Sequence, residues 1–269
     1  MENCNFAIVI PNYNNAEWLN KLFTSVYMQS YHNYSVIFID DCSTDGSVYE
    51  ANEWLERLVN DRKCIDAALI ENKTKRWNGG SRNDARECDL WGTSDYTIFI
   101  DSDDWFSDTD CLQAIADALK ADSYPDLLRL SYCSLIGEEY GHADLGGQNT
   151  IASIVHDPNV ACWTKCVKTE KLVKFPENTL MEDVTQHIAQ LDNVETVAAI
   201  SKPIIVWNRN NSNSCSRDEN LQGGKWKSSL YRYYADLLEL EVKNPECQAE
   251  LERRRAVALD NIKNDRFVQ

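Results

Sequence analysis

A cluster of carboxylates follows a short apolar run near the middle of the chain, in the sequence IFIDSDDWF. Asp101, Asp103 and Asp104 fall within four positions, with Ser102 among them. Negative charge gathered at the end of a buried strand is costly unless a cation or hydrogen bonds compensate it. A hard divalent cation with oxygen ligands supplies that compensation. The cluster therefore indicates a metal site, although aspartates that face water and cap the next helix explain it equally well.

Two earlier segments end apolar runs in polar residues. VIFIDDCSTDGS reaches Asp40 and Asp41, which suits a plain turn and helix cap; a calcium loop is disfavoured because its twelfth position holds Asn52 rather than Glu. IVIPNYNN breaks a strand at Pro11 and puts Tyr13 in the following loop. A tyrosine there can stack on a planar base or simply pack, so this segment alone is a weak indication.

Glu182 and Asp183 open an amphipathic helical pattern much further along the chain. Acidic residues are common in a first helical turn because they complement the helix dipole, so alone they indicate no function. Cys162 and Cys166 lie four apart without a second Cys or His pair nearby, which disfavours a structural zinc site.

The elements that must position these residues alternate in type through the first half of the chain. Apolar β-type runs alternate with helical patterns, in the order 6–10, 16–28, 35–39, 48–59, 65–70, 96–100 and 111–121. This alternation predicts a largely parallel sheet with helices on both faces. Ligands of such sheets collect at the carboxyl ends of the strands, where the polar segments above begin.

The second half has a less regular pattern. Its apolar runs and helical patterns predict strands at 127–132, 194–200 and 204–207, a loop at 137–147, a surface loop at 208–220, and helices at 181–191, 225–240 and 246–264.

Charge and composition exclude several classes of function. The chain has 269 residues and a formal net charge of −16, which disfavours binding to nucleic acid or anionic membranes. The first apolar run is too short for a signal peptide, and no stretch has the length of a membrane span. Ten scattered cysteines suit a reducing compartment. We therefore expect a cytoplasmic protein, free or peripheral at a membrane, without an integral membrane segment.

Taken in order, the segments resemble the family 2 glycosyltransferases. The resemblance rests on IVIPNYNN, SVYMQSYHNYSVIFIDDCSTDGS, NGGSRNDA, YTIFIDSDDWF and KFPENTLMEDV, and runs from about Ala7 to about Ser216. It implies the α/β GT-A fold, a Rossmann-like, mostly parallel sheet flanked by helices, with a C-terminal helical extension. It further implies a nucleotide-sugar-binding half at 1–130, an acceptor-binding and catalytic half of the same domain at 131–220, and C-terminal helices at 221–269.

By the same resemblance, a UDP-sugar donor binds at the strand ends. Pro11 and Tyr13 would line the nucleoside pocket, Asp41 would accept a hydrogen bond from the base, and Asp40 would shape the same wall. The family usually has Gly after this Asp pair, where this chain has Cys42.

The D-x-D of the family falls on Asp101, Ser102 and Asp103. Asp101 would contact the ribose side of the donor, and Asp103 would bind Mn²⁺ or Mg²⁺, with Asp104 as a neighbour that can share the metal. Arg82 would hold the strand end or the donor phosphates; an ordinary surface arginine is the alternative.

Three cations gather just before Arg82 in this acidic chain, namely Lys73, Lys75 and Arg76. They suit attraction of a diphosphate, and a solvated loop explains them as well.

The resemblance makes Asp183 the catalytic base of an inverting transfer to a glycan or glycoconjugate hydroxyl, as in polysaccharide biosynthesis. Glu182 would orient the helix start or contact the acceptor. Arg209 and Ser212 would close over the diphosphate, and Trp163 would stack on an acceptor sugar or pack in the core. A non-catalytic nucleotide-sugar sensor on the same fold is the main alternative. A nucleotidyltransferase is disfavoured because PNYNNAEWL lacks Gly, Lys and Arg.

Overall fold

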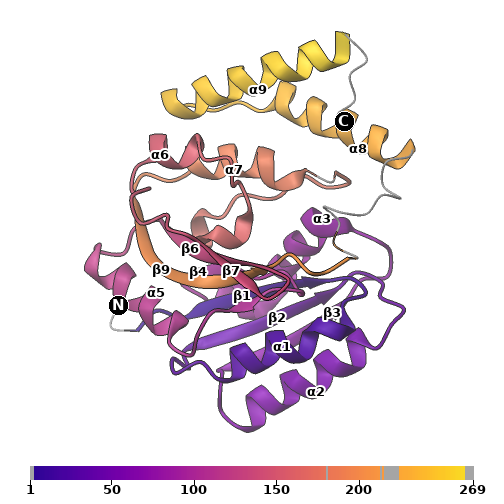
Figure 1. Ribbon diagram of the computed structural model, residues 1–269, viewed down its shortest axis with the longest axis vertical. Helices are drawn as coiled ribbons and strands as arrows, with labels where there is room; N and C mark the ends of the chain where they lie inside the picture. The colour runs from indigo at the N-terminus through magenta and orange to yellow at the C-terminus, as the bar shows by residue number, and fades with distance from the viewer. Residues whose placement is uncertain (1–2, 180, 213, 215–223, 264–269) are drawn as a thin grey trace.

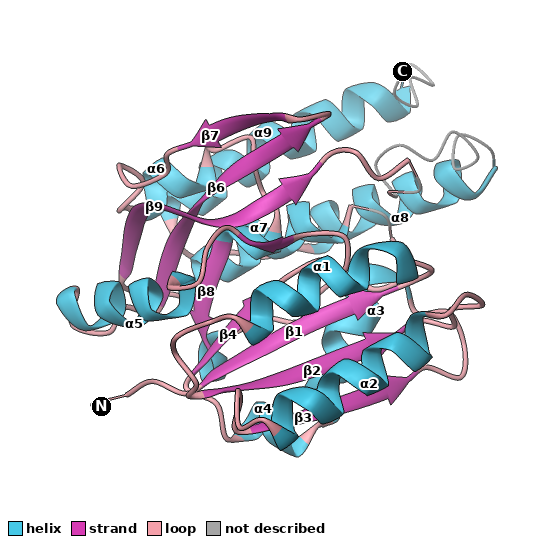
Figure 2. Ribbon diagram, turned by 60° about the horizontal axis from the view of Figure 1, so that its bottom comes forward, coloured by secondary structure: helices cyan, strands magenta, loops and turns pink. Residues whose placement is uncertain are grey.

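The computed structural model describes residues 3–179, 181–212, 214 and 224–263. Its strands form one nine-stranded mixed sheet in the order β3-β2-β1-β4-β8-β6-β9-β5, with β7 paired to β6 (Figure 2). The strands are β1 (Phe6–Asn12), β2 (Tyr34–Asp40), β3 (Asp66–Glu71), β4 (Tyr96–Phe99), β5 (Trp105–Phe106), β6 (Leu127–Ile136), β7 (Glu139–Ala143), β8 (Lys165–Lys168) and β9 (Val197–Asn208).

Helices cover both faces of the sheet (Figure 1). They are α1 (Ala16–Tyr27), α2 (Ser47–Asn60), α3 (Trp77–Asp84), α4 (Asp89–Gly92), α5 (Cys111–Ala121), α6 (Ile151–Val155), α7 (Glu182–Asp192), α8 (Gly224–Glu239) and α9 (Pro245–Lys263), with 3₁₀ turns at Ala85–Glu87, Cys162–Thr164 and Thr169–Lys171.

The parallel half of the sheet is the part predicted from the alternating pattern. β1 pairs in parallel with β2 and β4, and β3 pairs in parallel with β2. Side chains alternate between two cores: Ile8 belongs to the buried cluster that includes residues of α1, α2 and α5, whereas Val9 belongs to the cluster that includes residues of α7, α8 and α9. Because both faces are covered, β1 and β2 are buried along their whole length.

Three local predictions were wrong. β1 does not break at Pro11 but continues to Asn12. The carbonyl of Val9 accepts the N–H of Ile100 on the β4 side, and Pro11, two residues on, faces the same side beyond the end of β4. A proline there removes no ladder hydrogen bond, so the strand tolerates it.

The second half of the sheet contains the other two errors. The expected loop at 137–147 contains β7, an exposed strand antiparallel to β6. The two strands expected at 194–200 and 204–207 are one strand, β9, whose pairing with β6 shifts register around Pro203. β8 joins β4 to β6 with antiparallel pairing on both sides, so this half is mixed.

The C-terminal helices share a core with the rest of the domain. α8 and α9 lie against α7, and α9 also contacts α6 (Figure 1). Leu230, Leu237 and Leu251 belong to the same buried cluster as Ile154 and Ile188. Within the described residues, no helix combines the length and apolarity needed to cross a bilayer.

Candidate functional site

The polar segments that follow β1, β2 and β4 meet at the carboxyl edge of the parallel sheet. Asp40 ends β2 and is buried there. Its carboxylate accepts hydrogen bonds from Nδ2 of Asn12 at 2.9 Å and from the N–H of Ser43 at 2.8 Å. Asp40 therefore joins the end of β1 to the loop after β2.

Asp41 lies beside Asp40 and holds the start of α3. Its Oδ1 accepts the N–H of Arg76 at 2.6 Å and Nδ2 of Asn72 at 3.2 Å, and its Oδ2 accepts the N–H of Trp77 at 2.8 Å. Since each carboxylate oxygen can accept two hydrogen bonds, Oδ2 keeps room for one more donor. Tyr13 lies in the loop after β1 with its side chain 45% exposed, and the Lys75 ammonium lies over its ring.

Arg82 connects the two halves of the site. It projects from α3, is only 3% exposed, and donates from Nη1 to Oε1 of Glu182 at 2.6 Å and from Nη2 to Oδ1 of Asp101 at 2.8 Å. Burial lowers the pKa of the Arg82 guanidinium, but the neighbouring Cys162, Asp101 and Glu182 together raise it above its usual value. Arg82 therefore holds the end of β4 against the start of α7, the structural one of its two expected roles.

The carboxylates after β4 have separate environments. Asp103 accepts a hydrogen bond from Nδ2 of Asn211 at 2.8 Å, while Ser102 is buried and accepts one from Nδ2 of Asn15 at 2.8 Å. Burial, reinforced by the nearby charge of Asp101, raises the pKa of Asp103 to about 6. A carboxylate that resists ionisation in this way would be stabilised by a bound cation.

Asp104 has a different position from its neighbours. It is 1% exposed and accepts the N–H of Asn208 at 2.7 Å, which fastens the end of β9 to the cluster. In the described part of the chain, no three His, Cys, Asp or Glu side chains gather as a complete metal site. The donor set fits a magnesium-type ion, which takes one or two carboxylates and completes its shell with water and substrate phosphates.

Asp183 begins α7 next to the Arg82 contact. It is half-buried, and no other residue of the described chain donates a hydrogen bond to its carboxylate. Burial raises its pKa, opposed by the positive charges of Arg82 and Lys165. Burial and the adjacent Asp183 raise the pKa of Glu182 to about 7, although Arg82 opposes this. Asp183 thus differs from Asp101, Asp103 and Asp104, each of which accepts a hydrogen bond from another described residue.

Three further expected residues lie on the β6–β9 side. Trp163 is buried and packs edge-on against Tyr132, with ring centroids 5.0 Å apart, so its core role is the one the structure displays. The Arg209 guanidinium lies 4.9 Å from the centre of the Trp207 ring. Ser212 is exposed. In the expected surface loop at 208–220, residues 213 and 215–220 lie outside the described chain.

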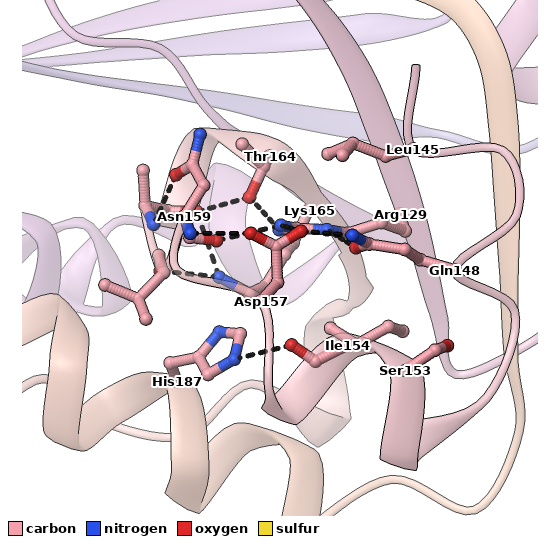
Figure 3. Close-up of polar contacts among 12 residues, drawn as sticks. Arg129, Leu145, Gln148, Ser153, Ile154, Asp157, Asn159, Thr164, Lys165 and His187 are labelled. Carbon is pink, nitrogen blue, oxygen red and sulfur yellow. Dashed lines mark hydrogen bonds and ion pairs between the residues drawn. The ribbon is translucent and has the colours of Figure 1, made fainter. Parts of the chain in front are cut away.

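A buried polar network supports the loop that carries Trp163 (Figure 3). Arg129 of β6 donates to the Asn159 carbonyl at 2.8 Å and pairs with Asp157 at 3.2 Å. Lys165 of β8 donates to the Val160 and Ala161 carbonyls at 2.8 and 2.9 Å. Two buried cations thereby fix the backbone of residues 157–164 on the Asp183 side of the site.

Lys165 predicts a pH dependence of stability. Burial, with the neighbouring Arg129 charge, lowers its pKa from 10.5 to about 7. Between these values the unfolded chain binds more protons than the folded one, so the contribution of Lys165 to stability rises with pH from about 7 to about 10.5. We expect Lys165→Met to lose this rise, as measured by urea unfolding at pH 7 and pH 9.5. The prediction would be contradicted if the free energy of unfolding changed by the same amount between pH 7 and pH 9.5 in wild type and variant.

Comparisons with known proteins identify the family and the fold. The family model "Glycosyl transferase family 2" matches residues 7–142, more than half of the chain. The chain belongs to glycosyl transferase family 2. Among its relatives is the amylovoran biosynthesis glycosyltransferase AmsB of Erwinia amylovora, which is 36% identical over 40% of this chain and 34% of its own length. The chain therefore spans about a third of that relative.

Solved structures confirm the family fold. TarS of S. aureus in complex with UDP-GlcNAc has a TM-score of 0.70 at 18% identity, over 95% of this chain and 71% of that one. A mannosyltransferase from Pyrobaculum calidifontis in complex with GDP-Man and Mn²⁺ has a TM-score of 0.65 at 17% identity, over 96% and 71%. These likenesses establish that this family 2 chain has the GT-A fold.

Several residues of the site escaped the sequence analysis. Asn211, Asn15 and Asn72 each donate to a site residue, and Lys165 lies buried against the Val160 and Ala161 carbonyls. Asparagines are common in loops, so their types gave no signal. Lys165 gave a weak signal, because it is a charged residue next to the apolar Cys166 and Val167. The structure places all three in β8, which pairs antiparallel with β4.

Proposed function

We propose that this chain transfers a hexose or N-acetylhexosamine from a UDP-sugar to a hydroxyl of a glycan or glycoconjugate, with inversion at the anomeric carbon. The chain of contacts Asp101–Arg82–Glu182 carries the proposal. Asp183 follows Glu182 directly at the start of α7, so its carboxylate would lie beside the cluster that would receive the donor. UDP-GlcNAc in the TarS complex supports the choice of nucleotide.

Each of these residues would have a separate role in the proposed reaction. Tyr13 would stack on the base and Asp41 would accept its N–H. Asp101 would hold the ribose side. Asp183 would take the proton of the acceptor hydroxyl as its oxygen attacks opposite the departing diphosphate. Because one displacement occurs, the configuration inverts.

Asp103 would hold a divalent cation, Mn²⁺ or Mg²⁺. When bound, the cation supplies Lewis-acid stabilisation of the charge on the leaving diphosphate. The Mn²⁺ in the mannosyltransferase complex supports this assignment, as does the raised pKa of Asp103.

Binding of nucleotide-sugars is tested by thermal denaturation. A ligand present at about 100 times its Kd adds roughly 2.7 kcal/mol to the free energy of unfolding, so we expect a UDP-sugar with Mn²⁺ to raise Tm by about 5–10 °C. UDP-sugars without metal should raise it less. No shift with any UDP- or GDP-sugar at millimolar concentration would contradict the proposal.

The same samples distinguish an enzyme from a nucleotide-sugar sensor. With a panel of saccharide acceptors, the enzyme releases nucleoside diphosphate, measured by a coupled assay. A sensor shows the Tm rise without release.

A further inference from the structure

Lys165 is the first residue of β8, and its side chain points to the face of the sheet that α7 covers. Val167, two residues on, belongs to the buried cluster that contains Val184 and Ile188 of α7, and alternate residues of a strand share a face. Arg129 lies directly opposite Lys165 in the pairing of β6 with β8. Two cations therefore lie side by side on the α7 side of the sheet, and Lys165 is only 2% exposed.

The ammonium of Lys165 has no carboxylate within ion-pair distance in the part of the chain that the structure describes. Asp157, the acidic residue of this network, is paired with Arg129 at 3.2 Å. Nζ of Lys165 donates to the carbonyls of Val160 and Ala161, and since an ammonium has three N–H groups, the third has no partner among the described residues. Burying a positive charge without a paired negative one is costly. The position therefore calls for a negative charge nearby.

The first turn of α7 supplies a negative charge. Asp183 and His187 are four residues apart on this helix, so they share a face. His187 lies in the network of the two cations, where its Nε2 donates to the Ile154 carbonyl at 3.1 Å (Figure 3). Burial raises the pKa of Asp183, and the positive charges of Arg82 and Lys165 oppose this rise.

The two cations that act on Asp183 differ in their own partners. Arg82 donates to Glu182 and to Asp101, so two carboxylates already offset its charge. Lys165 is held by carbonyl oxygens instead. Its charge is therefore the less compensated of the two, and the start of α7 is where it is available.

We propose that Lys165 is a positioning residue of the transfer reaction, whose buried ammonium keeps the Asp183 carboxylate ionised and able to accept a proton below neutral pH. The inference rests on the proposed function, in which Asp183 is the base. The acceptor's O–H bond breaks and the proton passes to the Asp183 carboxylate, while Lys165 exchanges no proton with the substrate and does not contact it.

Lys165 itself titrates near neutrality. Burial, with the neighbouring Arg129 charge, lowers its pKa to about 7, so the ammonium is present below this pH and lost above it. Burial raises the pKa of the Cys162 thiol to about 12 and lowers that of His187 well below its usual value, so both stay neutral. The charged and titratable groups that face Lys165 are Arg129 of β6, Asp157, Cys162 of the 3₁₀ turn, and Asp183 and His187 of α7.

Asp183 has one further neighbour that titrates in the same range. Burial and the adjacent Asp183 raise the pKa of Glu182 to about 7. Glu182 is present in wild type and in every Lys165 variant, so a comparison between them isolates the effect of Lys165. The other charged and titratable groups that act on Asp183, or on which it acts, are Arg82 of α3, Asp101 after β4 and Tyr233 of α8.

The first experiment measures the ionisation of Asp183 without any substrate. Protein labelled with ¹³C at the aspartate carboxyl carbon is titrated by NMR, and the Asp183 signal is identified by its loss in Asp183→Asn. We expect its midpoint at higher pH in Lys165→Met than in wild type. Lys168→Met is the matched control, because Lys168 lies on the same strand and pairs with Asp126 instead. It should have the wild-type midpoint.

The second experiment measures kcat from pH 5.5 to pH 9, as nucleoside diphosphate release from UDP-GlcNAc with Mn²⁺ and the saccharide acceptor that gives the fastest release. We expect Lys165→Met to be about tenfold slower than wild type near pH 5.5, because one charge a few ångströms away changes an ionisation equilibrium by about this factor. Near pH 8.5, where wild-type Lys165 is neutral, the two should agree within about twofold. Lys168→Met should follow wild type throughout.

Lys165→Gln separates the charge from the hydrogen bonds. Its amide keeps two N–H donors for the Val160 and Ala161 carbonyls but has no charge. It should resemble Lys165→Met in both experiments, and it serves alone if the methionine variant does not fold.

Three results would overturn the proposal. One is a loss of kcat by the same factor at every pH, which would assign Lys165 only to holding the loop. Another is an unchanged Asp183 midpoint in both Lys165 variants, and the third is a wild-type pH profile in Lys165→Gln. If wild type releases no nucleoside diphosphate, the proposed function fails, while the NMR midpoint still decides whether Lys165 acts on Asp183.

Discussion

Asp183→Asn is expected to abolish most of the turnover while leaving donor binding intact. An amide cannot take the proton of the acceptor hydroxyl, and loss of a general base typically lowers the rate by about 10²- to 10⁴-fold. Because the Asp183 carboxylate accepts no hydrogen bond from another described residue, the isosteric replacement breaks no contact. Nucleoside diphosphate release with acceptor and the Kd for UDP-sugar give the two readouts.

Asp122→Asn is the matched control, since Asp122 is exposed at the end of α5. It should match wild type in both readouts. Turnover of the Asp183 variant within about threefold of wild type would remove Asp183 from the mechanism. In wild type, the raised pKa of Asp183 should place the acidic limb of the kcat profile at higher pH than an ordinary aspartate would.

Arg82→Met is expected to be the most destabilising single change in the site. It leaves the buried Glu182 without its cation and removes the partner of Asp101. Breaking a buried ion pair from one side costs about 3–5 kcal/mol, which corresponds to a fall in Tm of roughly 10 °C for a domain of this size. Arg57→Met removes an exposed pair with Asp61 and a contact with the Tyr27 ring, and should cost about 1 kcal/mol or less.

The pH dependence of the Arg82→Met variant tests whether the unpaired Glu182 carboxylate causes the loss of stability. Without the guanidinium, the Glu182 pKa should rise beyond the raised value it already has. The folded state then holds a proton that the unfolded state releases, so stability falls as pH rises through this range. The loss of unfolding free energy in Arg82→Met should therefore be smaller at pH 5 than at pH 8. Adding Glu182→Gln to the Arg82→Met variant should restore part of it. A deficit independent of pH would point to lost packing instead.

The sequence predicted the parallel half of the fold well because its signals are local. Buried on both faces, the first strands are continuous apolar runs, and the helices between them have clear periodicity. β7 was missed because an exposed edge strand needs no apolar run. α3 was missed because Gly79 and Gly80 weaken its pattern; Gly79 lies so close to the Pro176 carbonyl that a larger residue would collide.

The site was predicted by residue type and order, whereas its contacts were not. Nothing local shows that Asp41 holds the start of α3, or that Arg82 joins Asp101 to Glu182 across about a hundred positions. Such contacts depend on the tertiary fold. The resemblance to the family predicted that these residues lie together, and the structure shows which of them have hydrogen-bond or ion-pair partners.

The packing of α8 and α9 on α7 has a consequence for synthesis. A chain that emerges from the ribosome in order can pair β1, β2, β3 and β4 early, because these pairings join residues of the first hundred positions. The helix that carries Asp183 has to wait, since Leu237 of α8 and Leu251 of α9 complete the core beneath it. The proposed donor-binding edge would therefore form before the side of the site that carries Asp183, which needs α8 and α9.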